Sequence, residues 1–157
     1  MVELKKVSTE QRELLYSINQ KYLYEMTNFY DDEMDEDGNY HYGYFDEYFT
    51  DPKRHAYFIY ADGRLCGFAM VHPYSNFGGE VDYVMGEFTV FPAFRRRHVA
   101  TEAAEKLLDM FRGEWEIKFN EKNTVGKSLW CKVTEKYAPV QKYYGEVETV
   151  LCFSNSN

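Results

Sequence analysis

The amino-acid sequence predicts one domain of the mixed α/β class, and three observations support this. Segments in which apolar and polar residues alternate, as in strands, occur before and after segments in which apolar residues recur at helical spacing. An Asp-Gly pair at residues 62–63 separates two apolar runs, which is typical of an antiparallel hairpin. The chain has 157 residues, of which 45% are hydrophobic, so we expect a single domain over residues 1–157 with one well-buried core.

The N-terminal region predicts a short strand followed by a long helix. The run VELKKV over residues 2–7 has the pattern of a strand. Ser8 and Gln11 then form a capping-box pattern, which predicts a helix from there to about Phe29. Apolar residues recur along it at helical spacing, so we expect them to face the core. They are Leu14, Leu15, Ile18, Tyr22 and Met26.

A charged turn ends this helix, and an aromatic stretch follows it. Residues 40–49, YHYGYFDEYF, are predicted either as a short helix under a pocket or as a partly ordered loop. Residues 31–47 combine acidic and aromatic side chains, which would suit an electronegative, aromatic-walled entrance for a cationic amine. A solvated loop explains the same charges equally well.

The middle of the chain predicts three antiparallel strands. The apolar runs at 56–60 and 65–71 flank the Asp-Gly turn, whose residues accept the positive φ that a tight hairpin requires. The run YVMGEFTVF over residues 83–91 follows a Gly78-Gly79 turn and is predicted as the next strand.

The C-terminal half predicts two helices and three strands. A strong helical stripe runs from Val99 to Phe111, and we expect it to stop at Gly113. Residues 115–119 are predicted as a strand, and residues 123–137 as a helix. The last two strands, which can pair with each other, are residues 140–144 and 147–153.

Charge and composition exclude several classes of protein. The formal net charge of -8 argues against a general nucleic-acid binder, because phosphate contacts need a broad basic face. No apolar run is long enough to span a bilayer, and the first residues lack the apolar centre of a signal peptide. We therefore expect a cytoplasmic protein with neither a nucleic-acid nor a membrane partner.

The cysteines and histidines do not predict a metal site. Cys66, Cys131 and Cys152 are widely spaced, without a CxxC or Cys/His ligand pattern. We expect them to be buried, reduced and inert. The four histidines also lack ligand spacing, so no metal is expected.

Residues 81–101 carry the strongest indication of function. An apolar strand is followed there by a turn at Pro92, by three consecutive arginines at 95–97, and by a helix that begins near Val99. This order places main-chain N–H groups and the positive end of a helix beside cationic side chains. We therefore expect an anionic group such as a pyrophosphate to bind there. A solvated turn before an ordinary amphipathic helix is the alternative.

Two segments resemble the motifs of the GNAT N-acetyltransferase family. Residues 94–101, FRRRHVAT, after the strand VMGEFTV, resemble motif A, whose signature is Arg/Gln-x-x-Gly-x-Gly/Ala. Arg95 occupies its first position and Ala100 its last. Residues 115–130 are similar to the family's strand and the Asn-x-x-Ala-x-x-apolar-aromatic helix after it. The residues on the positions of that pattern are Asn123, Gly126, Leu129 and Trp130.

The resemblance implies both a fold and a cosubstrate. The fold is GNAT-like, with a central, mostly antiparallel mixed sheet flanked by helices on both faces, and the cosubstrate is acetyl-CoA. The backbone of Phe88 and Val90 would pair with the pantetheine arm, and the N–H groups of residues 96–101 would hold the pyrophosphate. Asn123 would hydrogen-bond the arm from the opposite side of a V-shaped opening between strands. The implied cofactor-binding residues are Phe88, Val90, Arg95, Arg96, Arg97, His98, Val99, Ala100, Thr101, Asn123 and Trp130.

The chain departs from the family pattern at two of these positions. His98 stands where the family has a glycine, which lets the backbone approach the pyrophosphate without a Cβ. The imidazole could instead add a donor to the phosphates. Trp130 stands where many members have a tyrosine, and an indole N–H donates a hydrogen bond but supplies no proton at neutral pH.

The resemblance also implies direct attack of an amine on the thioester, which needs a base and hydrogen-bond donors. Glu87 is the candidate base, provided that burial raises its pKa, and an exposed strand glutamate is the alternative. Tyr137 is the candidate acid, Tyr143 and Tyr144 could substitute for it, and water could protonate the leaving thiolate instead.

Two classes of function follow. The first is an acetyl-CoA-dependent N-acetyltransferase that acts on the primary amine of a small cationic molecule. A protein N-terminus or lysine is the less favoured acceptor. The second is a non-catalytic GNAT-like module that binds acetyl-CoA or a partner, which the changes at His98 and Trp130 would permit. The apolar run at 147–153 is compatible with a homodimer formed through the last strands, and a plain core strand explains it equally well.

Overall fold

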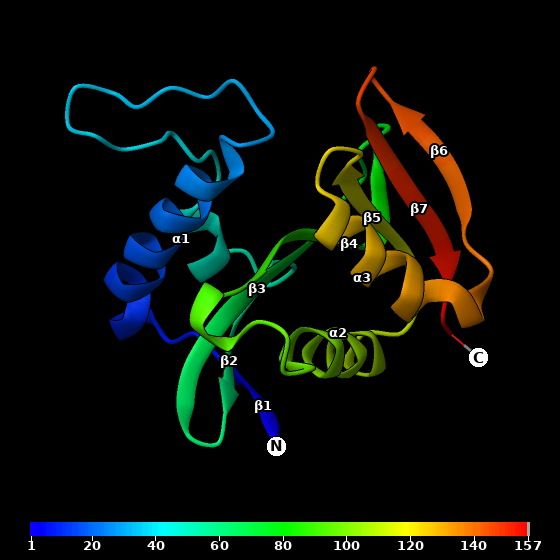
Figure 1. The fold of residues 1–157 in the computed structure, drawn as a ribbon, viewed down its shortest axis with the longest axis horizontal. Helices are drawn as coiled ribbons and strands as arrows, with labels where there is room; N and C mark the ends of the chain where they lie inside the picture. The colour runs from blue at the N-terminus through cyan, green and yellow to red at the C-terminus, as the bar shows by residue number, and fades with distance from the viewer. Residues whose placement is uncertain (157) are drawn as a thin grey trace.

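The computed structural model of the chain, which describes residues 1–156, contains a seven-stranded sheet (Figure 1). The strand order is β1-β2-β3-β4-β5-β7-β6. Within the described residues, β4 and β5 pair in parallel and every other neighbouring pair is antiparallel, which confirms the predicted mostly antiparallel mixed sheet. The strands are β1 (Val2–Lys6), β2 (His55–Ala61), β3 (Arg64–Tyr74), β4 (Glu80–Val90), β5 (Glu114–Asn120), β6 (Val140–Tyr144) and β7 (Glu148–Ser154).

Helices cover both faces of the sheet, as the family resemblance implied (Figure 1). Helix α1 packs Leu15 and Ile18 against Phe58 and Phe68 on one face. Helices α2 and α3 pack on the opposite face, where the larger core cluster forms around Ile117 and its neighbours. The helices are α1 (Arg12–Met26), α2 (Val99–Met110) and α3 (Thr124–Thr134), with short 3₁₀ turns η1 (Thr9–Gln11), η2 (Asp46–Phe49), η3 (Pro92–Phe94) and η4 (Glu135–Tyr137).

The predicted capping box opens the N-terminal helix. The Ser8 N–H donates to Oε1 of Gln11 at 3.0 Å, and the Gln11 N–H donates to the Ser8 carbonyl at 3.0 Å. One residue of the predicted core face was wrong, because Leu14 is 41% exposed. Asn19 is fully buried instead, so the buried face of the helix includes a polar side chain. The spacing of apolar residues could not predict this position.

The predicted hairpin and the short helix after residue 40 are also present. Asp62 and Gly63 have φ values of 51° and 78°, as a tight turn between β2 and β3 requires. The aromatic stretch ends in η2, which buries Tyr48. Of the cysteines, Cys66 is buried, while Cys131 and Cys152 are half-buried, and all three are free thiols.

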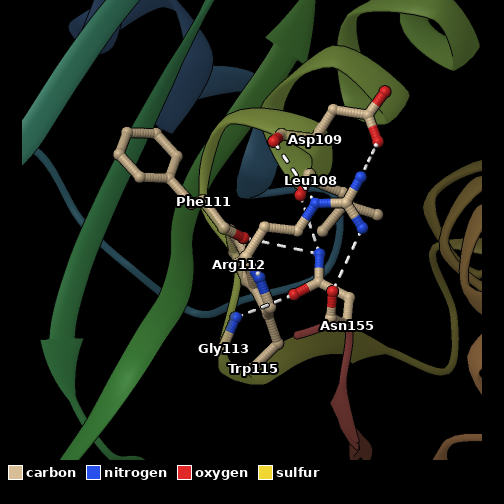
Figure 2. A network of polar contacts seen from close by, with 7 residues as sticks. All are labelled: Leu108, Asp109, Phe111, Arg112, Gly113, Trp115 and Asn155. Atoms are coloured by element: carbon tan, nitrogen blue, oxygen red, sulfur yellow. Dashed lines mark hydrogen bonds and ion pairs between the residues drawn. The ribbon is translucent and has the colours of Figure 1, made fainter. Parts of the chain in front are cut away.

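Helix α2 ends earlier than predicted, and a side chain from the end of the chain closes it (Figure 2). The C-cap is Phe111 and not Gly113. The buried Asn155 amide donates to the Leu108 carbonyl at 2.7 Å and accepts from the Gly113 N–H at 2.9 Å. Arg112 donates to the Asn155 carbonyl at 3.1 Å. The last turn of α2 is thus tied to the residue that follows β7.

We expect Asn155→Ala to lower the free energy of unfolding by about 2–3 kcal/mol, because it leaves the buried Gly113 N–H and Leu108 carbonyl without their partner. Urea titrations of the two proteins would measure the loss. Ser156→Ala is the control, since Ser156 is exposed and its loss should stay within about 0.5 kcal/mol. Equal stabilities of the Asn155 variant and the native chain would contradict a capping role.

Candidate functional site

An opening forms where two parallel strands separate. Strands β4 and β5 are paired only from Tyr83 with Trp115 to Met85 with Ile117. Beyond this point β4 pairs only with β3, and β5 only with β7. One edge of β4 from residue 86 to residue 90 is therefore without a strand partner in the described part of the chain.

A β-bulge lies where this separation begins. Met70 pairs with Glu87 and Val71 pairs with Met85, so Gly86 is the extra residue on β4. A bulge bends its strand and increases the local twist. Glycine fits this position, because a Cβ at Gly86 would lie 2.9 Å from Cδ2 of His72 and 3.2 Å from the Met70 carbonyl oxygen, so His72 would have to shift. The bulge thus directs β4 away from β5.

The loop after β4 leads to the N-terminus of α2 with a run of free donors. Within residues 1–156, no hydrogen bond is made by the backbone N–H groups of residues 96–101. His98 is the N-cap, with φ 61°, and Arg96 also has a positive φ of 65°. The glycine of the family pattern therefore corresponds to a left-handed position, which a histidine can occupy at a cost.

The three arginines of this loop differ in their surroundings. Arg95 donates from both terminal nitrogens to Glu25 of α1, at 2.7 and 2.8 Å, and from Nε to the Val90 carbonyl at 2.7 Å. Its guanidinium thus holds the loop against α1. Arg96 and Arg97 are exposed and form no ion pair within the described residues. The free positive charge of the loop comes from these two.

Helix α3 closes the opening from the other side. The Asn123 Oδ1 accepts from the Gly126 N–H at 3.0 Å, so Asn123 is the N-cap of α3. Trp130 is buried, and its ring meets Phe88 of β4 edge to face, with centroids 5.0 Å apart. Aromatic packing therefore fills the space under the separated strands on the α3 side.

Glu87 lies on the opposite face of β4, at the separation itself. Its Oε2 is buried and accepts no hydrogen bond from any described residue. Burial raises the pKa of Glu87 to about 8, and the positive charge of Lys118 on β5 opposes the shift only in part. The carboxyl group can therefore exchange a proton near neutral pH, as the sequence required of a base.

Three tyrosines that no sequence pattern placed together lie near this carboxyl group. They are Tyr22 from α1, and Tyr42 and Tyr48 from the segment before β2. Burial and then the negative charge of Glu87 raise the pKa of each. Of these three, Tyr42 alone belongs to residues 31–47, from which the sequence predicts an aromatic-walled entrance. The acidic residues at 31–37 are exposed in a loop that extends away from the sheet (Figure 1).

A second polar group borders the opening on β5 and β7. Tyr30 donates to Oε2 of Glu148 at 2.7 Å, and Lys118 lies 3.7 Å from the same carboxylate. Asn120, buried at the end of β5, donates to the Phe29 carbonyl at 3.3 Å. No sequence pattern indicated these residues, because they come from three distant segments.

The structure does not bring Tyr137 to the opening. Its ring stacks on Phe153 with centroids 5.4 Å apart, and Phe153 pairs with Trp115 at the start of β5. Trp115 lies beside Tyr83, four residues before Glu87. Tyr137 therefore lies beside the part of the sheet where β4 and β5 are still paired, and not beside Glu87 at their separation.

Two further findings concern membranes and metals. No helix within residues 1–156 combines the length and the apolar character that crossing a membrane requires. In the same residues, no group of three or more His, Cys, Asp or Glu side chains is arranged to hold a metal ion.

Comparison with known proteins identifies the family. The family model described as "Acetyltransferase (GNAT) family" matches residues 15–144. This is more than half of the chain, so the protein belongs to the GNAT acetyltransferase family. No curated protein matches the sequence.

Solved structures share the fold at low sequence identity. An acetyltransferase from Thermus thermophilus is 13% identical, with a TM-score of 0.67 over 98% of this chain and 97% of that one. A spermidine N-acetyltransferase from Vibrio cholerae, in complex with CoA and spermine, is 10% identical, with a TM-score of 0.66 over 99% and 96%. A diaminobutyrate acetyltransferase from Paenibacillus lautus, in complex with its substrate and coenzyme A, is 13% identical, with a TM-score of 0.64 over 100% and 96%.

We expect His98→Gly to raise the free energy of unfolding by about 0.5–1 kcal/mol, because glycine relieves the left-handed strain at φ 61°. Thermal or urea unfolding would measure the gain. Arg97→Gly is the matched control, since the φ of Arg97 is not positive and glycine should destabilise the chain there. A loss of stability in both variants would show that the His98 side chain makes a compensating contact.

Proposed function

We propose that the protein is an acetyl-CoA-dependent N-acetyltransferase that acetylates the primary amine of a small molecule arriving as an ammonium ion. The observation that carries this proposal is Glu87 at the separation of β4 and β5, a half-buried residue whose carboxyl Oε2 is buried and unpaired within the described residues. Membership of the acetyltransferase family supports it. Relatives of the same fold that act on spermidine and on diaminobutyrate support an amine as acceptor.

The residues of the chain fit acetyl-CoA. The free N–H groups of residues 96–101 and the N-terminus of α2 suit its pyrophosphate, with Arg96 and Arg97 adding positive charge. The unpaired edge of β4 at Phe88 suits the amide groups of the pantetheine arm, and the Nδ2 of Asn123 faces no competing acceptor within residues 1–156. Arg95 would act indirectly, by holding the loop through Glu25.

Glu87 would serve as the general base. It takes a proton from the ammonium group, and the neutral nitrogen then attacks the thioester carbonyl, forming the C–N bond while the C–S bond breaks. A carboxyl group with a pKa of about 8 is basic enough for this transfer and is still partly ionised at neutral pH. Tyr22, Tyr42 and Tyr48 would wall the acceptor, since their buried rings favour a cation. Tyr137 has no part in this arrangement, and water would protonate the leaving thiolate.

We expect acetyl-CoA to raise the melting temperature of the protein, since a ligand at 100 times its Kd adds about 2.7 kcal/mol to the native state. Ala100→Glu should abolish the shift, because it places a negative charge in the first turn of α2. Met110→Glu, at a residue 47% exposed near the other end of α2, should keep it. If both variants keep the shift, the N-terminus of α2 is not the pyrophosphate site.

We expect kcat/KM to rise with pH through about 8, because the base must be ionised, and Glu87→Gln to lower it by about 10²-fold. Glu105→Gln, at an exposed residue of α2, is the control. If acetyl-CoA binds but no amine in a broad panel is acetylated, the chain is instead a non-catalytic module.

The same variant has a signature in stability. The folded-state pKa of Glu87 lies above its value of 4.5 in the unfolded chain, so the native protein loses stability as pH rises from about 4.5 to 8. Glu87→Gln should therefore match the native protein near pH 4 and exceed its stability above pH 8. Equal stabilities at both pH values would contradict the burial of the charge.

A further inference from the structure

Arg54 lies buried beside the proposed acceptor wall with few partners. Its side chain is 10% exposed, and its guanidinium carbon lies 5.0, 5.4 and 4.6 Å from the ring centroids of Tyr44, Tyr48 and Tyr74. Its one ion pair within the described residues joins Nε to Asp51 at 3.4 Å. The side chain makes no hydrogen bond there, and Nε is buried without a partner.

Asp51 is already engaged by other donors. It accepts from the Tyr74 hydroxyl at 2.9 Å and from the Lys53 N–H at 2.9 Å. A guanidinium has five N–H donors in a planar fork, and a buried charge is costly unless it is paired and hydrogen-bonded. Arg54 therefore has N–H donors that no acceptor within residues 1–156 takes up, and its Nε is shielded from water.

Two neutral donors lie next to this guanidinium. The Tyr48 hydroxyl is buried close to Tyr42 and Arg54, but it makes no hydrogen bond of normal geometry within residues 1–156. His72 accepts from the Tyr74 N–H through Nδ1 at 3.1 Å, which leaves the proton of the neutral ring on Nε2. Burial and the charge of Arg54 lower the pKa of His72 to about 4, so the ring is neutral at pH 7. Arg54, Tyr48 and His72 thus gather donor groups in one place, and two of these groups, Nε of Arg54 and the Tyr48 hydroxyl, are buried without a hydrogen bond of normal geometry.

The register of the sheet places this donor cluster on the same face as Glu87. His55 pairs with Val71, so Arg54 stands opposite His72. Met70, two residues before His72 and on the same face, pairs with Glu87. With strands about 4.8 Å apart and two residues spanning about 6.7 Å, the backbones of Arg54 and Glu87 are roughly 12 Å apart. Tyr48 lies beside Arg54, whose guanidinium carbon is 5.4 Å from its ring centroid, and the charge of Glu87 also acts on its hydroxyl.

We propose that Arg54, Tyr48 and His72 bind a carboxylate carried by the acceptor, so that the substrate is an amino acid with its reactive amine at Glu87. The inference rests on the proposed function. A planar carboxylate matches the guanidinium fork with two parallel hydrogen bonds, and Arg54 provides the single positive charge that neutralises it. The carboxylate would supply the acceptors that the cluster lacks. A simple alkylamine would leave them unpaired, which is how a site built for a polar group rejects a substrate that lacks it.

The test uses matched acceptors that differ only in the carboxylate. These are ω-amino acids of three to seven carbons and the n-alkylamines of the same length, assayed with acetyl-CoA. We expect the best amino acid to exceed its alkylamine in kcat/KM by roughly 10- to 100-fold, the range for a hydrogen-bonded charged group, with the difference mainly in KM. Arg54→Gln should remove this preference by slowing the amino acid alone.

Two variants guard against a folding artefact. Tyr48→Phe removes only an unpartnered hydroxyl, so it should keep the fold and weaken the preference. Lys53→Gln removes the neighbouring positive charge, which is 58% exposed, and should leave the preference unchanged. Equal rates for the paired acceptors, or an equal loss for both in Arg54→Gln, would overturn the inference and leave Arg54 a packing residue.

A binding measurement separates this inference from the proposed function. Melts of the CoA-saturated protein with each ω-amino acid need no turnover. A shift that Arg54→Gln removes would support the carboxylate site even if no acceptor is acetylated, and no shift with any amino acid would overturn it. A missing shift with acetyl-CoA itself would instead count against the proposed function.

Discussion

The short parallel pairing between β4 and β5 is the constraint on which the site depends. Pairing stops at Met85, where the next residue, Gly86, is an extra residue in β4 that packs closely against His72. Separation of the strands frees an edge of β4, carries that strand to the loop before α2, and leaves Glu87 between the two strands. A straight β4 would continue the ladder and close the same space with hydrogen bonds.

Burial without a partner then gives the opening its chemistry. Glu87 faces hydroxyl groups and rings instead of a salt-bridge partner, so the pKa of its carboxyl group is raised to about 8. Lys118, farther along β5, forms its ion pair with Glu148 instead. On the other face, Phe88 and Trp130 fill the space with aromatic contacts. Adjacent residues of β4 thus point to opposite faces, with Glu87 on a polar side of the sheet and Phe88 on an apolar one.

The sequence predicted elements well and long-range partners poorly. Strand alternation, the helical stripe of α2 and the Asp-Gly turn are local signals, and each produced the element expected. Leu14 was misplaced because spacing alone does not say which of two adjacent apolar residues faces the sheet. Tyr137 was chosen for its chemistry, but its position follows from stacking on Phe153, which no local pattern encodes.

The same contrast between local signals and long-range partners applies to the residues of the candidate site. Glu87 and the helix N-terminus at His98 were predictable because both lie within one continuous segment. The grouping of Arg54 with the three tyrosines near Glu87 was not predictable, because strand register and helix docking bring these residues together from distant parts of the chain. The left-handed backbone at His98 likewise emerged only with the fold, although the family glycine marked the position.

The ion pair between Arg95 and Glu25 joins two compartments through one helix. Glu25 and Tyr22 lie within a single turn of α1, so the helix that anchors the loop before α2 also supplies a ring near Glu87. Under the proposed function, a shift of the loop on binding acetyl-CoA moves the wall that receives the amine. The two substrates would then bind cooperatively, each changing the affinity of the other by the same factor.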